Sequence, residues 1–305
     1  MPNRIAGLHH VTALASDARA TDAFYTETLG LRRVKKTVNF DAPDVYHLYY
    51  GDETGRPGSV MTYFPFPGAA PARPGTGAVG ETRFAIPEGT AASWVERLGN
   101  SDVGRDAWGA THLGFTGPDG ERLALVEVAD DTRAPWTGGG VAANVAIRGL
   151  HGVTLNLMDT AETADLLQVM GFERQEQHGG MLRMAVPGGT AGTVDLAARP
   201  DLEPAREGAG AIHHIAFSVP DRAAQDEMRA RMAEIGMRVT QPIDRDYFWA
   251  IYFRSPGGVL FEIATETPGF DRDEPVADLG RSLKLPRQHE AQRPRLERSL
   301  PPLET

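Results

Sequence analysis

Four segments of this 305-residue chain share one layout, and the repeat limits the fold more than any other feature of the sequence. Each segment has an apolar alternating run, a helical stretch that ends at a glycine, and further apolar runs around a turn of Pro-Gly type. The helix-ending glycines lie 69, 72 and 65 residues apart, at Gly30, Gly99, Gly171 and Gly236. Glycine suits the left-handed backbone that ends many helices. We therefore predict one helix in each segment.

The turns separate runs with strand composition, such as YHLYYGD (residues 46–52) and FWAIYF (residues 248–253). One strand before each helix and about three after it make a βαβββ module. Four such modules, numbered one to four along the chain, predict an α+β fold with curved, mixed and mainly antiparallel sheets. The turn prolines are Pro57, Pro118, Pro187 and Pro256.

The spacing of the modules suggests two tandem domains. Modules one and two fall in residues 1–133, and modules three and four fall in residues 148–265. Residues 134–147 are rich in glycine and alanine, which is typical of a linker. Residues 266–305 are rich in proline and charge, and we expect an extended tail there.

Composition excludes several kinds of site. A net charge of -10 offers no basic face for nucleic acid. No run of eighteen apolar residues is present and the N-terminus lacks a secretory signal, so we expect a cytoplasmic protein with no membrane partner. The chain has no cysteine, which excludes disulfides and thiolate ligands. Any transition metal must therefore be held by nitrogen and oxygen.

Two modules carry adjacent histidines in the first strand, in GLHHVT (residues 7–12) and AIHHIA (residues 211–216). Neighbouring strand residues face opposite sides, so one histidine of each pair faces the concave side of its sheet. Repeat alignment makes His10 and His214 equivalent, with Glu81 and Gly152 in modules two and three. A lone buried histidine is more often a hydrogen-bonded core residue. Two at equivalent positions need partners for four ring nitrogens, which favours metal binding.

A carboxylate in the last strand of module four completes a candidate site. Glu262 lies six residues after the turn proline, inside the apolar run GGVLFEIAT. The same count gives Tyr63 in module one, Ala124 in module two and, after an insertion, Asp195 in module three. A carboxylate is costly to bury without a partner, so a solvent-facing strand edge is the alternative to coordination. We favour coordination.

Two histidines and one carboxylate on one face are typical of non-haem Fe(II) oxygenases. This arrangement leaves neighbouring coordination positions open for a chelating substrate and dioxygen. A net charge of about +1 would remain on the ion, which favours a phenolate or catecholate ligand. The ligands alone do not select the metal, because the same set also binds Zn²⁺, Ni²⁺ or Mn²⁺.

The chain resembles the vicinal oxygen chelate superfamily, which includes glyoxalase I, bleomycin resistance proteins and extradiol dioxygenases. GLHHVT, IHHIAFSVPD (residues 212–221), SPGGVLFEIATETPGF (residues 255–270) and DEPVADLG (residues 273–280) are similar to its hydroquinone ring-cleaving branch. The resemblance implies an iron centre at His10, His214 and Glu262, the three residues to which the repeat also points.

The resemblance also implies four residues around the metal: Thr12, His213, Arg245 and Tyr252. Thr12, Arg245 and Tyr252 would bind substrate. Arg245 could hold an anionic oxygen, or form a salt bridge with an adjacent aspartate instead. Tyr252 could donate a hydrogen bond or simply pack. His213 could act as an acid or base, although it must reach round the strand to do so.

The predicted function is an Fe(II)-dependent, extradiol-type dioxygenase that cleaves a hydroquinone or a catechol-like diol. Its partners would be a small aromatic substrate and dioxygen, and open β-modules of this kind favour a homodimer. A metal-dependent lyase or isomerase of the glyoxalase kind would consume no oxygen. A binding protein for aromatic compounds would need no intact metal site.

Overall fold

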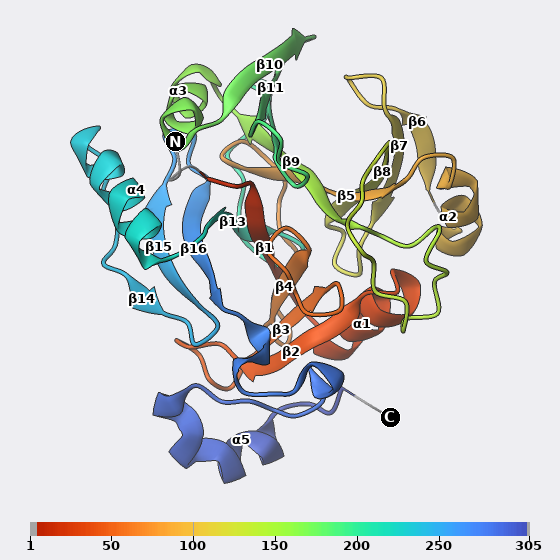
Figure 1. The fold of residues 1–305 in the computed structure, drawn as a ribbon, viewed down its shortest axis with the longest axis vertical. Coiled ribbons are helices and arrows are strands. Elements are labelled where there is room, and N and C mark those ends of the chain that lie inside the picture. Colours follow the sequence, from red (N-terminus) through yellow and green to blue (C-terminus); the bar gives the residue numbers. More distant parts are fainter. Residues whose placement is uncertain (1–4, 100, 304–305) are drawn as a thin grey trace.

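Two curved, mixed eight-stranded sheets form the centre of the computed structural model, which describes residues 5–99 and 101–303 (Figure 1). All four βαβββ modules are present, so the predicted fold class is confirmed. Module one consists of β1 (Leu8–Ala15), α1 (Ala18–Ala23), a π-helical turn η1 (Phe24–Thr28), β2 (Arg32–Val38), β3 (Tyr46–Gly51) and β4 (Val60–Pro65). Module two consists of β5 (Ala78–Pro87), α2 (Ala91–Leu98), β6 (Asp102–Arg105), β7 (Thr111–Thr116) and β8 (Arg122–Val128).

The second half of the chain repeats this order and adds the tail. Module three consists of β9 (Gly149–Leu157), α3 (Ala161–Met170), β10 (Glu173–His178), β11 (Met181–Ala185) and β12 (Thr193–Ala198). Module four consists of β13 (Ile212–Val219), α4 (Arg222–Glu234), β14 (Ile243–Asp244), β15 (Phe248–Arg254) and β16 (Leu260–Pro268). The tail contains three short 3₁₀ turns and one helix: η2 (Phe270–Arg272), η3 (Val276–Asp278), η4 (Arg287–Gln292) and α5 (Arg293–Ser299).

Each sheet joins one module from each half of the chain. The first sheet, in the order β14-β15-β16-β13-β1-β4-β3-β2, pairs module four with module one. The second, in the order β10-β11-β12-β9-β5-β8-β7-β6, pairs module three with module two. The antiparallel seams are β1 against β13 and β5 against β9. Each sheet therefore contains strands from both predicted domains, residues 1–133 and residues 148–265. The division of the chain into these two domains stays a prediction.

Local sequence explains where the helices begin and end. Asp17 and Asp221 precede α1 and α4, and their carboxylates accept hydrogen bonds from the first free backbone N–H groups. Gly99 and Gly171 end α2 and α3 in the left-handed conformation, with φ of 65° and 105°. Gly30 and Gly236 follow the ends of η1 and α4 with φ of 68° and 81°, so all four predicted stops are confirmed.

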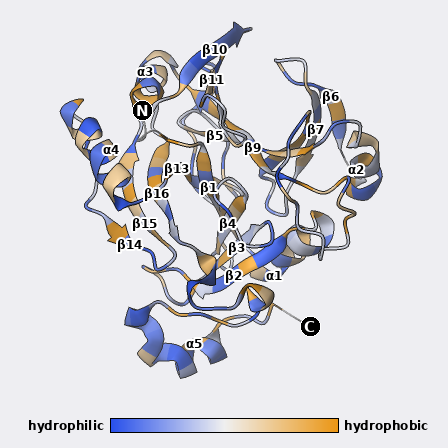
Figure 2. Ribbon diagram, in the orientation of Figure 1, coloured by the Kyte–Doolittle hydropathy of each residue, from blue (hydrophilic) through white to orange (hydrophobic). Residues whose placement is uncertain are grey.

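The tail follows the outer strand of the first sheet and ends in the hydrophilic helix α5 (Figures 1 and 2). Its anchor is Lys35 of β2, a fully buried ammonium that donates to Asp273 at 2.7 Å and to Glu274 at 2.6 Å. Within the described residues, no helix has both the length and the apolar character needed to cross a membrane.

Candidate metal centre

The seam between β1 and β13 brings together residues that are 204 positions apart. Thr12 of β1 lies opposite His214 of β13, and His10 lies opposite Ala216. Ala216 in turn pairs with Glu262 on the parallel strand β16. The three predicted ligands therefore lie on three adjacent strands and one face, and their donor atoms all fall within 4.8 Å of one another.

The distances between these atoms fit ligands of a single ion. The Nε2 atoms of His10 and His214 are 3.3 Å apart. Glu262 Oε2 lies 2.9 Å from His214 Nε2 and 3.6 Å from His10 Nε2. Two ligands at right angles, each about 2.1 Å from a metal ion, are about 3.0 Å apart. The spacing matches three neighbouring coordination positions.

Burial and charge favour the same interpretation. The Glu262 side chain is 0 % exposed, and among the described residues neither carboxylate oxygen has a well-aligned hydrogen-bond donor. Burial raises the pKa of Glu262, but His10 and His214 lower it overall to well below its usual value. Burial lowers the pKa of His214 to about 4. A buried carboxylate without a donor is costly, and a cation would remove that cost.

The first histidine of each pair orients the second. His9 Nδ1 lies 2.9 Å from His10 Nδ1, and His213 Nδ1 lies 2.8 Å from His214 Nδ1. Each candidate ligand is thereby held through Nδ1, which leaves Nε2 directed at the centre. Fixing the second ring nitrogen in this way sets the tautomer and orientation of a metal-binding histidine. The sequence showed the pairs, but it gave no role to His9.

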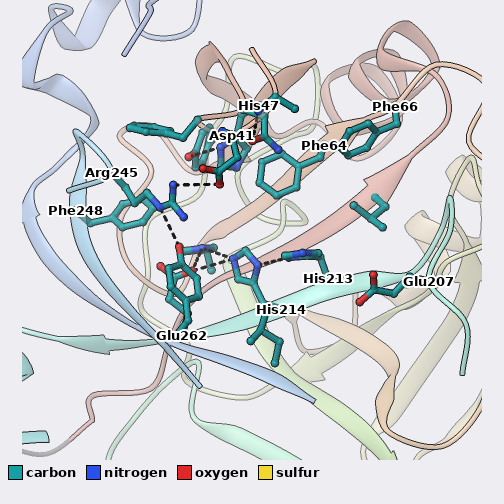
Figure 3. A pocket seen from close by; sticks show the side chains of 18 of the residues that line it. Asp41, His47, Phe64, Phe66, Glu207, His213, His214, Arg245, Phe248 and Glu262 are labelled. Atoms are coloured by element: carbon teal, nitrogen blue, oxygen red, sulfur yellow. Dashed lines mark hydrogen bonds and ion pairs between the residues drawn. The ribbon is translucent and has the colours of Figure 1, made fainter. Parts of the chain in front are cut away.

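A cavity of about 540 Å³ opens above the three candidate ligands (Figure 3). All three line it, so the side of the centre opposite the sheet faces open space. The other walls are mainly aromatic and aliphatic: Phe40, Phe64, Phe66, Phe248, Tyr49 and Leu260. A cavity of this size and character suits a small aromatic molecule.

Three of the four residues implied by the resemblance line this cavity, and the fourth lies behind it. His213, Arg245 and Tyr252 form part of the wall. Thr12 is buried next to the centre, with Oγ1 at 2.8 Å from His214 Nε2. The structure therefore brings all four predicted residues to the site, with Thr12 beside a candidate ligand instead of in the open cavity.

Arg245 and Tyr252 act as a pair. Arg245 Nε donates to the Tyr252 hydroxyl at 3.2 Å. Burial and Glu262 raise the pKa of Tyr252 well above its usual value, which keeps the phenol protonated. Burial lowers the pKa of Arg245, but Tyr252 and Glu262 raise it overall. The pair presents one fixed positive charge and one hydroxyl at the cavity wall.

The ion-pair partner of Arg245 comes from another module. Its Nη1 lies 3.8 Å from Asp41 Oδ2 in the loop between β2 and β3, and its guanidinium lies over the Phe40 ring at 5.2 Å. The sequence had suggested an aspartate next to Arg245 for this role. The tail supports the loop, because His289 Nε2 bonds to the Phe40 carbonyl at 2.8 Å. No local sequence signal could have revealed these contacts.

The register also corrects one position of the repeat. Thr12 pairs with Thr62 on β4 just as Ala216 pairs with Glu262 on β16. Thr62, and not Tyr63, is therefore the module-one counterpart of Glu262. Its hydroxyl donates to Thr12 Oγ1 at 3.0 Å and lies 2.8 Å from His47 Nε2. A hydroxyl network stands where a fourth protein ligand would otherwise lie.

The second sheet contains a closed copy of the site. Asp195, the counterpart of Glu262, binds the guanidinium groups of Arg83 and Arg183. At the position of His214 is Gly152, where an added Cβ would collide with the Thr193 hydroxyl. One buried and one partly buried positive charge, and no space for an imidazole, prevent this copy from holding a cation.

Comparison with known proteins agrees with the geometry. The sequence model of the Glyoxalase/Bleomycin resistance protein/Dioxygenase superfamily matches residues 7–125 and 149–263. The chain belongs to this superfamily. The two matched ranges begin where modules one and three begin, so this superfamily member consists of two copies of the matched unit, and the resemblance seen in the sequence is confirmed.

Relatives match over the whole chain. "Putative ring-cleaving dioxygenase MhqO" of Bacillus subtilis is 40 % identical, and the match covers 100 % of this chain and 98 % of that protein. "Chlorohydroquinone/hydroquinone 1,2-dioxygenase" of Sphingobium indicum is 34 % identical, over 98 % and 97 %. A crystal structure of a "putative dioxygenase" from Bacillus subtilis superposes with a TM-score of 0.95 at 40 % identity, over 99 % of this chain and 98 % of that one. Maize glyoxalase I, at 15 % identity and a TM-score of 0.63 over 86 % of this chain and 92 % of that one, shares the fold.

Proposed function

We propose that this protein is a metal-dependent dioxygenase that cleaves the ring of a hydroquinone or a catechol-like diol. We further propose Fe(II) as the metal, with His10, His214 and Glu262 as its ligands. The main support for the proposal is the arrangement of the site: three buried donor atoms lie at ligand spacing on the sheet, and an aromatic cavity opens on the other side of them. The names of the relatives support the same chemistry.

When bound, Fe(II) would supply redox chemistry for dioxygen and a cation for the ring oxygens. The protein residues would hold the substrate. Phe40, Phe64 and Phe248 present apolar surface to an aromatic ring. The cavity volume of about 540 Å³ falls within the usual range for small-molecule sites.

Arg245 and Tyr252 would recognise the oxygen of the bound diol. A protonated phenol and a guanidinium both donate hydrogen bonds, so together they stabilise a ring oxygen that loses its proton. His213 faces the same cavity, and burial lowers its pKa. A neutral imidazole in this position could accept a proton from the substrate hydroxyl. Thr12 would act through His214, because it contacts the ligand and does not line the cavity.

Oxygen uptake tests the proposal. The protein is reconstituted anaerobically with Fe(II), and dioxygen consumption is measured after addition of hydroquinone, its methyl and chloro derivatives, or catechol. We expect uptake with at least one diol and a ring-opened product. His10→Ala and Glu262→Gln are expected to lose bound iron and uptake together, whereas His178→Ala, which alters an exposed histidine on β10, retains both. Absence of uptake with every diol contradicts the dioxygenase and leaves an oxygen-independent lyase or isomerase, or a binding protein.

Three further proposals rest on the sequence. A homodimer, a cytoplasmic location and the absence of nucleic-acid or membrane partners follow from the sequence arguments alone. Size-exclusion chromatography with light scattering checks the first of these directly.

A further inference from the structure

A second cavity, of about 300 Å³, adjoins the metal-site cavity. The two share three lining residues: Glu207, His213 and Leu260. In Figure 3, Glu207 lies beyond His213 on the side away from Glu262. The other walls come from residues 72–80, 120–122, 205–207 and 210–212, from Asn156, and from the hairpin between β15 and β16. A molecule that leaves the metal centre past His213 would enter this space.

The second cavity is rich in positive charge, although the chain as a whole carries a net charge of -10. Four arginines line it: Arg73, Arg122, Arg206 and Arg254. Their positive charge is concentrated around a volume of about 300 Å³, which is large enough for one small anion.

The acidic residues nearby offset only part of this charge. Arg73 is already paired with Glu203 at 2.6 Å. The Glu121 carboxylate accepts a hydrogen bond from the Tyr63 hydroxyl at 2.8 Å, and burial raises its pKa. Arg122 is 71 % exposed and lies 3.9 Å from Glu81, which is a weak contact. Among the residues that line the cavity, Arg122, Arg206 and Arg254 therefore face two carboxylates, Glu121 and Glu207, and a net positive charge remains.

The proposed reaction creates an anion from a neutral substrate. A phenolic hydroxyl is protonated at neutral pH when it is free in solution. Cleavage of the bond between a hydroxyl-bearing ring carbon and its unsubstituted neighbour places one oxygen atom of dioxygen on each carbon. The first carbon becomes a carboxylic acid and the second an aldehyde, so hydroquinone, C₆H₆O₂, and O₂ give C₆H₆O₄. That acid is ionised at neutral pH.

We propose that the second cavity is a binding site for the carboxylate of the ring-opened product on its way out of the metal centre. This inference rests on the proposed function, because it takes its ligand class from ring cleavage. Arg254 and Arg122 bind the carboxylate through its negative charge, whereas a neutral diol has no charge to pair with them. Glu207, on the wall between the two cavities, opposes the anion.

Calorimetric titration tests the site without turnover. The probe is cis,cis-muconate, a six-carbon dicarboxylate, added to the iron-loaded protein under anaerobic conditions, with and without saturating hydroquinone. Because hydroquinone occupies the metal-site cavity only, we expect muconate to bind with the same Kd in both titrations. Displacement of muconate by hydroquinone, or no binding of muconate at all, overturns the proposal.

Variants identify the residues. Arg254→Gln and Arg122→Gln are each expected to weaken muconate about tenfold, the effect of one charged hydrogen bond, and Glu207→Gln to tighten it. Arg105→Gln is the matched control. Arg254 donates to the Gly258 carbonyl of its hairpin at 2.9 Å, and Arg105 makes the same bond to Gly109 on a hairpin outside the cavity.

The outcome is separable from that of the proposed function. An unchanged Kd in the Arg254 and Arg122 variants overturns the second site even if oxygen uptake is normal. If uptake fails with every diol while muconate binding responds to the variants as expected, the dioxygenase is wrong and the assignment of the cavity to its product falls with it.

Discussion

Replacement of Asp195 by asparagine is expected to destabilise the second sheet and to leave the candidate metal centre intact. Asp195 is fully buried on β12, and its oxygens accept from Arg183 Nε and Nη2 at 2.8 Å each, from Trp108 Nε1 at 3.0 Å, and from Arg83. It occupies the position that Glu262 holds in the first sheet. The substitution keeps the shape of the side chain and removes its charge.

The expected loss follows from the charges that remain. Arg83 is 2 % exposed, and among the described residues its guanidinium has, besides Asp195, one hydrogen-bond acceptor, the Val153 carbonyl at 3.2 Å. Removing one partner of a buried ion pair costs about 3–5 kcal/mol. With an unfolding entropy of about 2.1 cal/mol/K per residue, a chain of this length loses about 1.6 °C per kcal/mol. The melting temperature is therefore expected to fall by about 5–8 °C.

Differential scanning calorimetry of the variant and the parent protein measures this shift. The control is Asp201→Asn, which removes one side of an exposed pair with Arg199 at 2.9 Å and is expected to change the melting temperature by less than about 1 °C. Iron content should be the same in all three proteins, because Asp195 lies in the other sheet. A shift within 1 °C for Asp195→Asn would refute the argument that this copy is a structural charge cluster, and loss of iron would refute its independence from the metal centre.

Three further predictions concern the charge of Asp195, the anchor of the tail at Lys35 and the hydroxyl of Tyr252. Burial raises the pKa of Asp195, but Arg183 and Arg83 lower it overall below 3.8. A lowered pKa in the folded protein means that the charged carboxylate stabilises the fold above the unfolded pKa, and that this stabilisation is lost as the pH falls. The difference in melting temperature between Asp195→Asn and the parent protein should therefore persist near pH 7 and shrink as the pH falls below 3.8. Lys35→Met should release the tail, seen as faster tryptic cleavage after Arg272; equal cleavage rates would contradict the anchor. Tyr252→Phe should lower kcat about ten- to a hundredfold at unchanged iron content, and an unchanged kcat would assign Tyr252 to packing.

The local pattern of the sequence was sufficient for the modules and for the three candidate ligands. Side chains alternate between the two faces of any strand, and a glycine can end any helix, whatever these elements pack against. Repeats of these local patterns can therefore be recognised without knowing which strands pair in the fold. Equal positions in equal modules then placed His10 and His214 on corresponding faces. Glu262 stood out because a carboxylate in an apolar strand needs a partner.

Counting residues from the turn proline gave the wrong counterpart of Glu262 in module one, because strand register decides which residues face the site. A turn of different length shifts a strand by one residue, and a shift of one residue reverses the face of every side chain. For this reason Tyr63 was assigned to a position that Thr62 occupies. Contacts between distant segments were also invisible: Asp41 with Arg245, and His289 with the Phe40 carbonyl, join residues more than two hundred positions apart.

The sequence by itself determined four βαβββ modules, two doubled histidines and one costly carboxylate. Only the tertiary structure decided that module one pairs with module four, and so that the histidines meet across the β1–β13 seam. Local propensity sets each strand, but pairing between strands depends on long-range packing and hydrogen bonding that no short segment encodes. The same pairing left the other two modules with arginines around Asp195, so the described residues contain one candidate metal centre in place of two.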